Sequence, residues 1–414
     1  MKILHITPSM DLSTGGVCQA VRTMINGLRE EQVYNEVICL DSPDAQHLND
    51  CLFPVHALGP GKGPWRYSSK LTKWLVKELP SFDVVIVHGM WLYYSHAAIK
   101  AIKILRKRQS SNSCNIPKLY LMPHGMLDPY FQRAKERKWK AIRNTVYWKL
   151  VERAVVNDAD GLLFTCEEEC RLAKEPFSPY KPKKELIVGL GVENPPAKNF
   201  VIQEAFETKF PFLKDEPYVL FLSRVHEKKG VDLLIKAYAQ LKRKYHHEMV
   251  LSSGLEDFMP PFPKLVIAGP GLDTTYGKEM ENLTLIEGLK SDILFPGMLT
   301  GADKWGVFYN CEAFILPSHQ ENFGIAVVEA MACGKPVLIS DQVNIWREIV
   351  AGGGGAAEPD TLKGTSKLLA EWVKMTFDEK HCMGMKARDS FQRDFSVKAA
   401  SKRLLSMLFN NTSI

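Results

Sequence analysis

The chain has 414 residues, of which 45% are hydrophobic and 24% charged, and its formal net charge is +6. This length and composition predict a globular protein of two domains, with three as the alternative. A transmembrane protein is not expected, because no apolar run approaches the roughly 18 residues that span a bilayer. The nine cysteines form no C-x-x-C pair. Only Cys166 and Cys170 have a spacing that a metal could use, and without a second ligand pair we favour reduced thiols in a cytosolic protein.

The first half of the chain alternates short apolar runs with amphipathic segments, as in doubly wound α/β domains. Strands are predicted at 2–7, 35–41, 55–58, 83–88 and 118–122, with helices at about 18–29 and 69–78. Gly15 and Gly16 lie between the first strand and the first helix, where they would let the backbone approach an anion. A plain glycine turn explains them equally well, and they are not the G-x-G-x-x-G of dinucleotide-binding domains.

Histidines follow two of the predicted strands. His88 ends the strand at 83–88, and His124 lies in the loop 123–129 together with Asp128. Ligands of open parallel sheets bind beyond the carboxyl ends of the strands, so we expect His124 at the site, where an imidazole can hydrogen-bond a hydroxyl and stabilise developing charge. For His88 a core or surface position is an equal alternative. Asp128 is a candidate for the wall of an acceptor pocket.

Residues 132–153 are predicted to form a strongly basic helix that is rich in Trp and Tyr. Three interpretations fit this segment: a helix at an anionic membrane surface, an acceptor-binding patch, or a solvated basic face over a core stripe. Nucleic acid is not expected as a partner, because no recognised binding motif accompanies the basic residues.

Residues 194–198, with two adjacent prolines, are predicted to link the first domain to a second α/β domain. The first strand of this domain, at 218–222, leads into a loop that carries Arg224 and Lys229. Two fixed cations on such a loop can neutralise a diphosphate and the charge that builds as it leaves.

Glycines mark several turns of the second domain. Gly269 and Gly297 follow its next two predicted strands. A long loop is predicted at 246–263, a mobile turn at the four glycines 352–355, and a final helix at about 397–409.

The stretch after the strand at 313–317 combines a loop with the start of a helix, from about Gly324 to Ala332. The first-turn N–H groups of a helix are unpaired and its dipole is positive there, which suits a phosphate. Glu321 and Glu329 flank the turn, and helical spacing would place them roughly 10 Å apart. Glycosidase carboxylates that share one reacting bond lie about 5–9.5 Å apart, so we expect each Glu to bind a different hydroxyl-bearing part of a diphosphate ligand.

Three segments carry a resemblance to a known family. Glu321 and Glu329, with Phe323 and Gly324 between them, resemble the E-x7-E motif of the retaining GT-B glycosyltransferases of family 4. Residues 223–230 resemble the GRLxxxKG motif of that family, with Ser in place of the first Gly, and residues 123–129 are similar to the PHGMLDP segment of enzymes of bacterial envelope and exopolysaccharide synthesis.

The resemblance implies an α/β fold of GT-B type, in which two doubly wound Rossmann-like domains face each other across a cleft. Residues 1–196 would bind the acceptor, residues 197–396 would bind the nucleotide-sugar donor, and the tail at 397–414 would pack back on the first domain.

The resemblance also implies roles for single residues. Glu321 would meet hydroxyls of the donor sugar, and Glu329 would bind the ribose. Arg224 and Lys229 would bind the diphosphate, with His124 beside the reacting centre. The other donor-binding positions implied are Gly15, Gly16, Gly269, Gly297, Asn322, Phe323, Gly324 and Ile325. His88 and Asp128 are the acceptor candidates.

The expected reaction transfers a hexosyl group, with retention, from a UDP- or GDP-sugar to a saccharide or lipid-linked saccharide acceptor in polysaccharide biosynthesis. No cofactor is expected, because the nucleotide-sugar is a co-substrate, and no metal, because Asp158 and Asp160 precede a strand instead of ending one. A GT-B-like sugar-nucleotide epimerase and a non-catalytic sugar-nucleotide-binding protein are the alternatives. The expected location is cytoplasmic, with a peripheral position at the inner face of the cell membrane as a variant of it.

Overall fold

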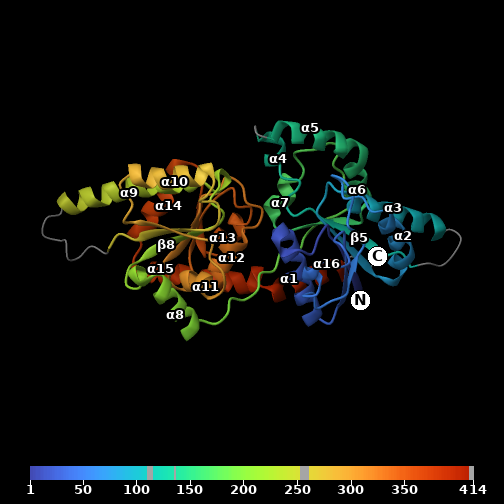
Figure 1. Ribbon diagram of the computed structural model, residues 1–414, viewed down its shortest axis with the longest axis horizontal. Helices are drawn as coiled ribbons and strands as arrows, with labels where there is room; N and C mark the ends of the chain where they lie inside the picture. Colours follow the sequence, from blue (N-terminus) through green and yellow to red (C-terminus); the bar gives the residue numbers. More distant parts are fainter. Residues whose placement is uncertain (110–114, 135–136, 252–260, 410–414) are drawn as a thin grey trace. The chain divides into compact units, whose positions relative to one another are not determined.

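The computed structural model describes residues 1–109, 115–134, 137–251 and 261–409. The chain divides into two compact units: unit 1 comprises Met1–Glu193 with Ser396–Ile414, and unit 2 comprises Asn194–Phe395. The first division falls at the start of the predicted linker 194–198. In each unit a parallel sheet is combined with helices (Figure 1), which confirms the prediction of two Rossmann-like α/β domains.

Unit 1 is built on seven described strands, all parallel, in the order β3-β2-β1-β4-β5-β6-β7. They are β1 (Lys2–Ile6), β2 (Tyr34–Cys39), β3 (Val55–Ala57), β4 (Val84–His88), β5 (Lys118–Met122), β6 (Gly161–Phe164) and β7 (Glu185–Ile187). The chain first adds strands on one side of β1 and then, from β4, on the other. The carboxyl ends of β1 and β4 therefore border the point where the winding reverses, the usual ligand position in such sheets.

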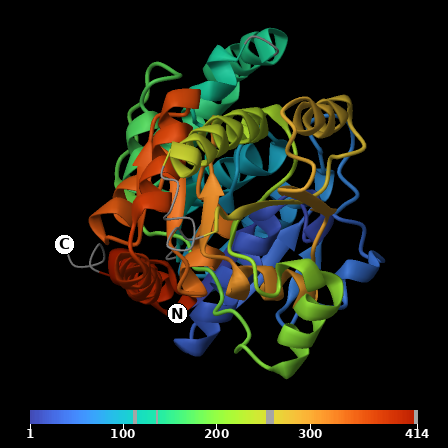
Figure 2. The ribbon, with the colours of Figure 1, turned by 90° about the vertical axis from the view of Figure 1, so that its left-hand side faces the viewer.

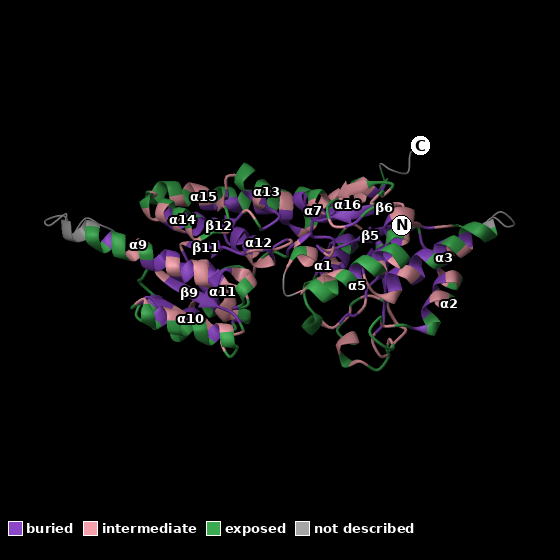
Figure 3. Ribbon diagram, turned by 90° about the horizontal axis from the view of Figure 1, so that it is seen from above, coloured by how far each residue is buried: buried purple, intermediate pink, exposed green. Residues whose placement is uncertain are grey.

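The central strands of unit 1 are apolar and buried, because helices cover the sheet (Figure 3). The helices are α1 (Gly16–Glu30), α2 (Ser69–Glu78), α3 (Tyr93–Gln109), α4 (Tyr130–Arg133), α5 (Lys138–Tyr147), α6 (Arg153–Asp158), α7 (Glu167–Leu172) and α16 (Val397–Phe409). Helix α16 packs on α1, where Gly27 permits the close approach: a Cβ there would lie 2.2 Å from Ser401 Oγ. Leu404 and Leu408 of α16 are buried in the same cluster as Ile3, so the end of the chain completes this core.

Unit 2 has six described parallel strands in the order β10-β9-β8-β11-β12-β13. Figure 2 turns this unit toward the viewer. They are β8 (Tyr218–Leu222), β9 (Lys264–Ala268), β10 (Ile293–Gly297), β11 (Ala313–Leu316), β12 (Val337–Ser340) and β13 (Gly355–Glu358). The helices are α8 (Phe200–Lys209), α9 (Val231–Leu251), α10 (Thr275–Ile286), α11 (Gly301–Asn310), α12 (Ile325–Ala332), α13 (Trp346–Ala351), α14 (Leu362–Lys374) and α15 (Phe377–Ser390). Here the winding reverses between β8 and β11.

The structure corrects the single helix predicted at 132–153. Helix α4 ends at Arg133, and Ala134 has an extended backbone with ψ of 125°. Helical structure resumes at Lys138 with α5 and continues through a π-helical turn, Trp148–Glu152, into α6. The basic composition favoured a helix throughout but carried no signal for this break.

Two predicted loops are also shorter than expected. Helix α9 continues to Leu251, so the predicted loop 246–263 begins later, and residues 252–260 lie outside the described part of the chain. The turn predicted at 352–355 ends at Gly355, which begins β13. A Cβ at Gly355 would lie 2.2 Å from Val337 O, so glycine serves close strand packing there. Helix α8 was not predicted. Among the described residues, no helix is both long and apolar enough to cross a membrane.

Candidate functional site

In unit 2 the loops that follow β8 and β11 lie in direct contact. The β8 loop ends in a short 3-10 helix, Glu227–Lys229, and in Gly230, whose φ is +65°. Glycine is required there because a Cβ would lie 2.1 Å from Pro317 O on the other loop. Ser318 Oγ donates to Lys228 O at 2.9 Å. The two loops therefore form one fixed surface at the carboxyl ends of β8 and β11.

Lys229 and Glu321, both predicted site residues, form an ion pair across these loops. The side chain of Lys229 is only 11% exposed. The backbone of Glu321 is held on both sides: its N–H donates to Gln342 O at 2.9 Å, and its carbonyl accepts from Asn344 N–H at 2.9 Å. Arg224 is exposed, and in the part of the chain that the structure describes it forms no ion pair. The loop after β8 thus supplies one cation that is held in an ion pair and one that is accessible.

Glu329 lies on α12 and pairs with Lys304 of α11, whose Nζ is 2.7 Å from Glu329 Oε1. Burial raises the pKa of Glu329, and the charge of Lys304 acts in the opposite direction. Sequence reasoning missed Lys304. It lies 25 positions from Glu329 on another helix, and no motif quoted for the site includes it.

Among the described residues, no side chain caps the N-terminus of α12. Its N-cap residue is Gly324, whose φ is +76°. Uncapped first-turn N–H groups can bind an anion, and Ile325 is the first helical residue. Phe323 is 4% exposed and packs edge-on against Phe395, so its side chain anchors the loop and only its backbone can meet a ligand. Asn322 Oδ1 accepts from Asn344 Nδ2 at 3.4 Å.

The two predicted glycines of this unit differ in their surroundings. A Cβ at Gly269 would lie 1.8 Å from Ser223 O, so glycine is what lets the β9 turn pack against the β8 loop. The N–H of Gly269 donates to Gly297 O at 2.8 Å. Gly297 has φ of +73° and open space where a Cβ would be. Gly269 therefore shapes the wall of the site, and Gly297 leaves its backbone accessible.

Three histidines form a hydrogen-bonded row at the carboxyl side of the sheet in unit 1. His5 Nδ1 lies 3.0 Å from His88 Nε2, and His88 Nδ1 lies 3.0 Å from His124 Nε2. Burial lowers the pKa of His5 and of His124 to about 4, and it lowers the pKa of His88 well below its usual value. All three imidazoles are therefore neutral near pH 7.

Asn35 determines the tautomers of this row. Its Nδ2 donates to Val33 O at 2.9 Å, so its Oδ1 is the atom that accepts from His5 Nε2 at 3.0 Å. A neutral His5 that donates from Nε2 must accept at Nδ1, so His88 donates from Nε2. By the same reasoning His124 donates from Nε2 to His88. His124 Nδ1 is left with a lone pair and can accept a hydrogen bond from a ligand hydroxyl.

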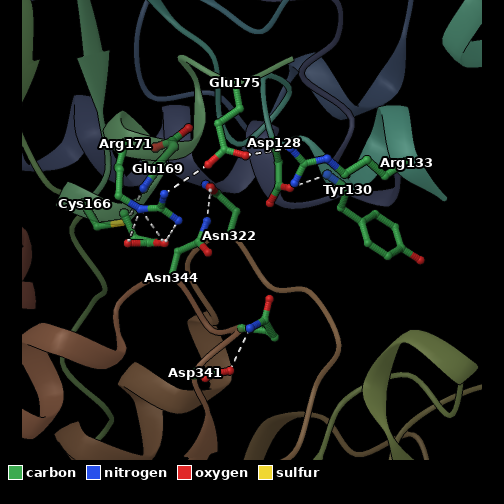
Figure 4. A network of polar contacts seen from close by, with 12 residues as sticks. Asp128, Tyr130, Arg133, Cys166, Glu169, Arg171, Glu175, Asn322, Asp341 and Asn344 are labelled. Atoms are coloured by element: carbon green, nitrogen blue, oxygen red, sulfur yellow. Dashed lines mark hydrogen bonds and ion pairs between the residues drawn. The ribbon is translucent and has the colours of Figure 1, made fainter. Parts of the chain in front are cut away.

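The turn at His124 is held in an unusual conformation. His124 has φ of +51°, a region that non-glycine residues rarely occupy except at turns and functional sites. The next N–H, of Gly125, donates to Glu169 Oε1, and Glu169 Oε2 accepts from Thr165 N at 2.7 Å. Figure 4 shows Glu169 and Cys166 at the start of α7. Glu169 was not among the predicted site residues, although it holds the turn that carries His124, which was predicted.

Both acceptor candidates, His88 and Asp128, are buried. His88 has no exposed surface, so it cannot contact a ligand directly and instead supports His124. Asp128 is 7% exposed, and its Oδ1 accepts from Tyr130 N at 2.8 Å, which ties it to the start of α4. Asp128 therefore stays a candidate for the wall of an acceptor pocket, and His88 becomes a candidate for supporting His124.

Gly15 and Gly16 lie at the N-terminus of α1. Gly15 has φ of +115° and makes no side-chain cap. A Cβ at either position would meet no atom within 4 Å, so packing does not demand glycine, and the helix N-terminus stays approachable.

Cys166 Sγ accepts from Glu169 N at 3.4 Å as the N-cap of α7. Within the described residues, no group of three or more His, Cys, Asp and Glu could hold a metal ion.

Known proteins resemble the chain over both units. Residues 202–389 match the family described as glycosyl transferases group 1, and residues 15–190 match a glycosyl transferase 4-like domain. The D-inositol 3-phosphate glycosyltransferase of Gordonia bronchialis is 29% identical over 266 residues, which are 60% of this chain and 52% of that protein. An uncharacterized glycosyltransferase of Methanocaldococcus jannaschii is 27% identical over 184 residues, 42% of each chain. The chain thus spans about half the length of these curated relatives.

Among solved structures, the Anabaena protein Alr3699/HepE in complex with UDP and glucose aligns with a TM-score of 0.71. It is 17% identical and the alignment covers 99% of this chain and 100% of that one. At this identity the likeness shows the fold, and it agrees with the two parallel sheets described above.

Proposed function

We propose that this chain, which belongs to family 4 of the glycosyltransferases (glycosyl transferases group 1), transfers a hexosyl group from a nucleotide-sugar to a saccharide or lipid-linked saccharide acceptor in polysaccharide biosynthesis. One observation carries this proposal most directly. The Lys229–Glu321 ion pair and the uncapped N-terminus of α12 both lie at the reversal point of the unit 2 sheet. A cation and free N–H groups suit a diphosphate there, and the carboxylate suits sugar hydroxyls.

The diphosphate is the charged part of the proposed donor. As the bond between the sugar C1 and the phosphate oxygen breaks, negative charge grows on the leaving phosphate. Arg224 and Lys229 would neutralise it, together with the N–H groups at Ile325 and its neighbour. Because these groups supply positive charge, we expect transfer to proceed without a divalent metal, and undiminished activity in EDTA would agree with this.

The stereochemical course we propose is retention by front-face substitution. The acceptor oxygen forms its bond to C1 on the face from which the phosphate departs, and its proton passes to the leaving phosphate oxygen. Glu321 would hold hydroxyls of the donor sugar, and Glu329 would hold the ribose. His124 would accept a hydroxyl hydrogen bond at Nδ1, the atom that the histidine row leaves free to do so.

The base of the donor is proposed to be uracil, with guanine as the alternative. The Anabaena structure that aligns with this chain contains UDP and glucose. A thermal-shift panel of UDP, GDP and ADP with their glucose, galactose, N-acetylglucosamine and mannose conjugates tests the choice, because a ligand that binds only the folded state raises the melting temperature. A shift with one base identifies it. No shift with any nucleotide would count against the proposal.

Two other functions make different predictions in a turnover assay. A transferase releases nucleoside diphosphate only when an acceptor is present, and NMR of the product shows the anomeric configuration of the donor. A sugar-nucleotide epimerase converts the donor without an acceptor. The melting temperature of a binding protein rises with the nucleotide-sugar, but such a protein neither releases nucleoside diphosphate nor converts the donor. Nucleotide release that rises with acceptor concentration is the result expected here.

A further inference from the structure

Helix α5 and the π-helical turn after it expose a row of large apolar side chains on unit 1. The exposed fractions are 86% for Trp139, 57% for Ile142, 52% for Val146 and 77% for Leu150. Successive members are three, four and four positions apart, so they share one face of the helix. Single exposed apolar residues are common on proteins, but a continuous row marks an interaction surface.

The opposite face of the same helix is the one that packs on the unit. Asn144, Trp148 and Glu152 lie on that face and are buried. Tyr147 stacks on Trp65 with ring centroids 4.3 Å apart, which fixes the rotation of the helix. The core stripe expected beneath a solvated basic helix is therefore present, and the apolar row is a second, separate face that the core does not use.

Cations border this row on both sides. Within residues 137–153 the basic residues are Arg137, Lys138, Lys140, Arg143, Lys149 and Arg153. The one acidic residue in that range, Glu152, is buried on the packed face. Lys138, Lys140, Lys149 and Arg153 are exposed, and among the residues that the structure describes they take part in no ion pair. The surface is thus apolar along its middle and positive along its edges.

We propose that α5 binds the surface of a membrane that contains anionic lipids. The apolar row would lie among the upper parts of the acyl chains, and the bordering cations would lie against the lipid phosphates, as in helices that lie in the plane of a bilayer interface. Charge complementarity favours an anionic membrane over a neutral apolar partner, because cations that form no ion pair within the described chain border the row. The proposal does not depend on the transfer reaction.

Flotation with lipid vesicles tests the apolar row. The protein is expected to float with vesicles of phosphatidylglycerol and phosphatidylcholine, and much less with phosphatidylcholine alone. The double variant Trp139→Ser, Leu150→Ser should lose about tenfold or more of its partition, because two large apolar side chains no longer leave water. The matched control Ile286→Ser, Phe377→Ser removes two exposed apolar side chains from unit 2 and should float like the wild type.

Neutralising two cations tests the charged borders. Lys138→Gln, Lys149→Gln is expected to lower the partition about thirtyfold, and added salt should weaken wild-type binding. Lys398→Gln, Lys402→Gln on α16 is the control with the same change of net charge, and it should bind as the wild type does. All the altered side chains are exposed, so the melting temperature should stay unchanged.

Two results would overturn the proposal. One is wild-type protein that does not float with anionic vesicles, or a row variant that floats equally well. The other is a wild-type dimer by light scattering that the row variant turns into a monomer without any vesicle binding, since the row would then join two copies of the chain. Transfer to a soluble acceptor should be the same in wild type and row variant, so failure here is distinguishable from failure of the proposed function.

Discussion

Lys304 Nζ lies 2.7 Å from Glu329 Oε1, and burial raises the pKa of that carboxyl while Lys304 opposes the rise. If Glu329 binds ribose as a carboxylate, Lys304 is what keeps it ionised. Lys304→Met should therefore raise the pKa of Glu329 further, and as the pH is lowered from 8 to 6 the donor affinity of the variant should decline more than that of the wild type, since protonation removes the negative charge of the accepting group.

Calorimetric titration of UDP over that pH range checks this relation. Lys209→Met is a matched control. Lys209 of α8 forms an ion pair with Asp303, which lies on α11 next to Lys304, and this pair is more exposed than the Lys304–Glu329 pair. Its pH profile should follow the wild type. A Lys304→Met profile that also follows the wild type would mean that Lys304 does not set the charge of Glu329.

The histidine row predicts the tautomer of His124. In the wild type, a long-range nitrogen–proton NMR correlation should show a neutral ring with the proton on Nε2. His88→Ala removes the acceptor of that proton, so the spectrum should show mixed tautomers, and kcat should drop about tenfold to a hundredfold with little change in donor KM. His381→Ala, on α15 of unit 2, is the control. Protonation of His124 at Nδ1 in the wild type would refute the row.

Glu152 predicts an unusual pH dependence of stability. Burial raises its pKa from 4.5 to about 7, while Trp91 N and Ser95 Oγ donate to Oε1. Between these pH values the carboxyl is protonated in the folded chain and ionised in the unfolded chain. Its contribution to the free energy of unfolding is thus fully present below pH 4.5 and is lost as the pH rises through 7.

Glu152→Gln removes this titration. Its free energy of unfolding relative to the wild type should rise by about 3 kcal/mol between pH 4.5 and pH 8, measured by chemical unfolding at several pH values. The exposed Glu204→Gln serves as control and should show no such trend. A relative stability of Glu152→Gln that is flat with pH would mean that the carboxyl is ionised in the folded protein.

Two glycines of unit 2 form a matched pair for stability. In Gly297→Ala the new Cβ would lie in open space. The expected loss of stability is therefore only the strain of a left-handed backbone at a non-glycine residue, about 1–2 kcal/mol. Gly269→Ala would place Cβ 1.8 Å from a backbone oxygen, that of Ser223, so it should destabilise far more or prevent folding. Unfolding curves of both variants compare the two costs, and equal values would show that the β9 turn can move away.

The elements of the fold were predictable where local patterns decide them. The apolar runs at 83–88, 118–122 and 313–317 are nearly the observed β4, β5 and β11, because buried parallel strands read as continuous apolar runs. The break after Arg133 was not predictable, since the residues around it favour helix. Helix α8 was missed because its exposed Phe200 and Val201 blur the amphipathic pattern.

The candidate site was predictable in its motifs but not in its supporting contacts. Arg224, Lys229 and Glu321 lie in loops after strands, which a sequence shows. Lys304 and Glu169 reach their partners through tertiary packing, and neither belongs to a motif. The roles of the site residues remain predictions.

Donor binding by unit 2 is the central claim, and calorimetric titration of UDP-glucose and UDP into wild type, Arg224→Ala and Lys229→Met measures it most directly. Charge-assisted contacts contribute about 1.5–3 kcal/mol each, so either substitution should weaken binding about tenfold to a hundredfold. Arg243→Ala is the control: Arg243 lies on α9 and forms an exposed ion pair with Glu287. This variant should bind both ligands like the wild type. Unchanged affinity in both site variants, with the fold intact, would contradict the claim.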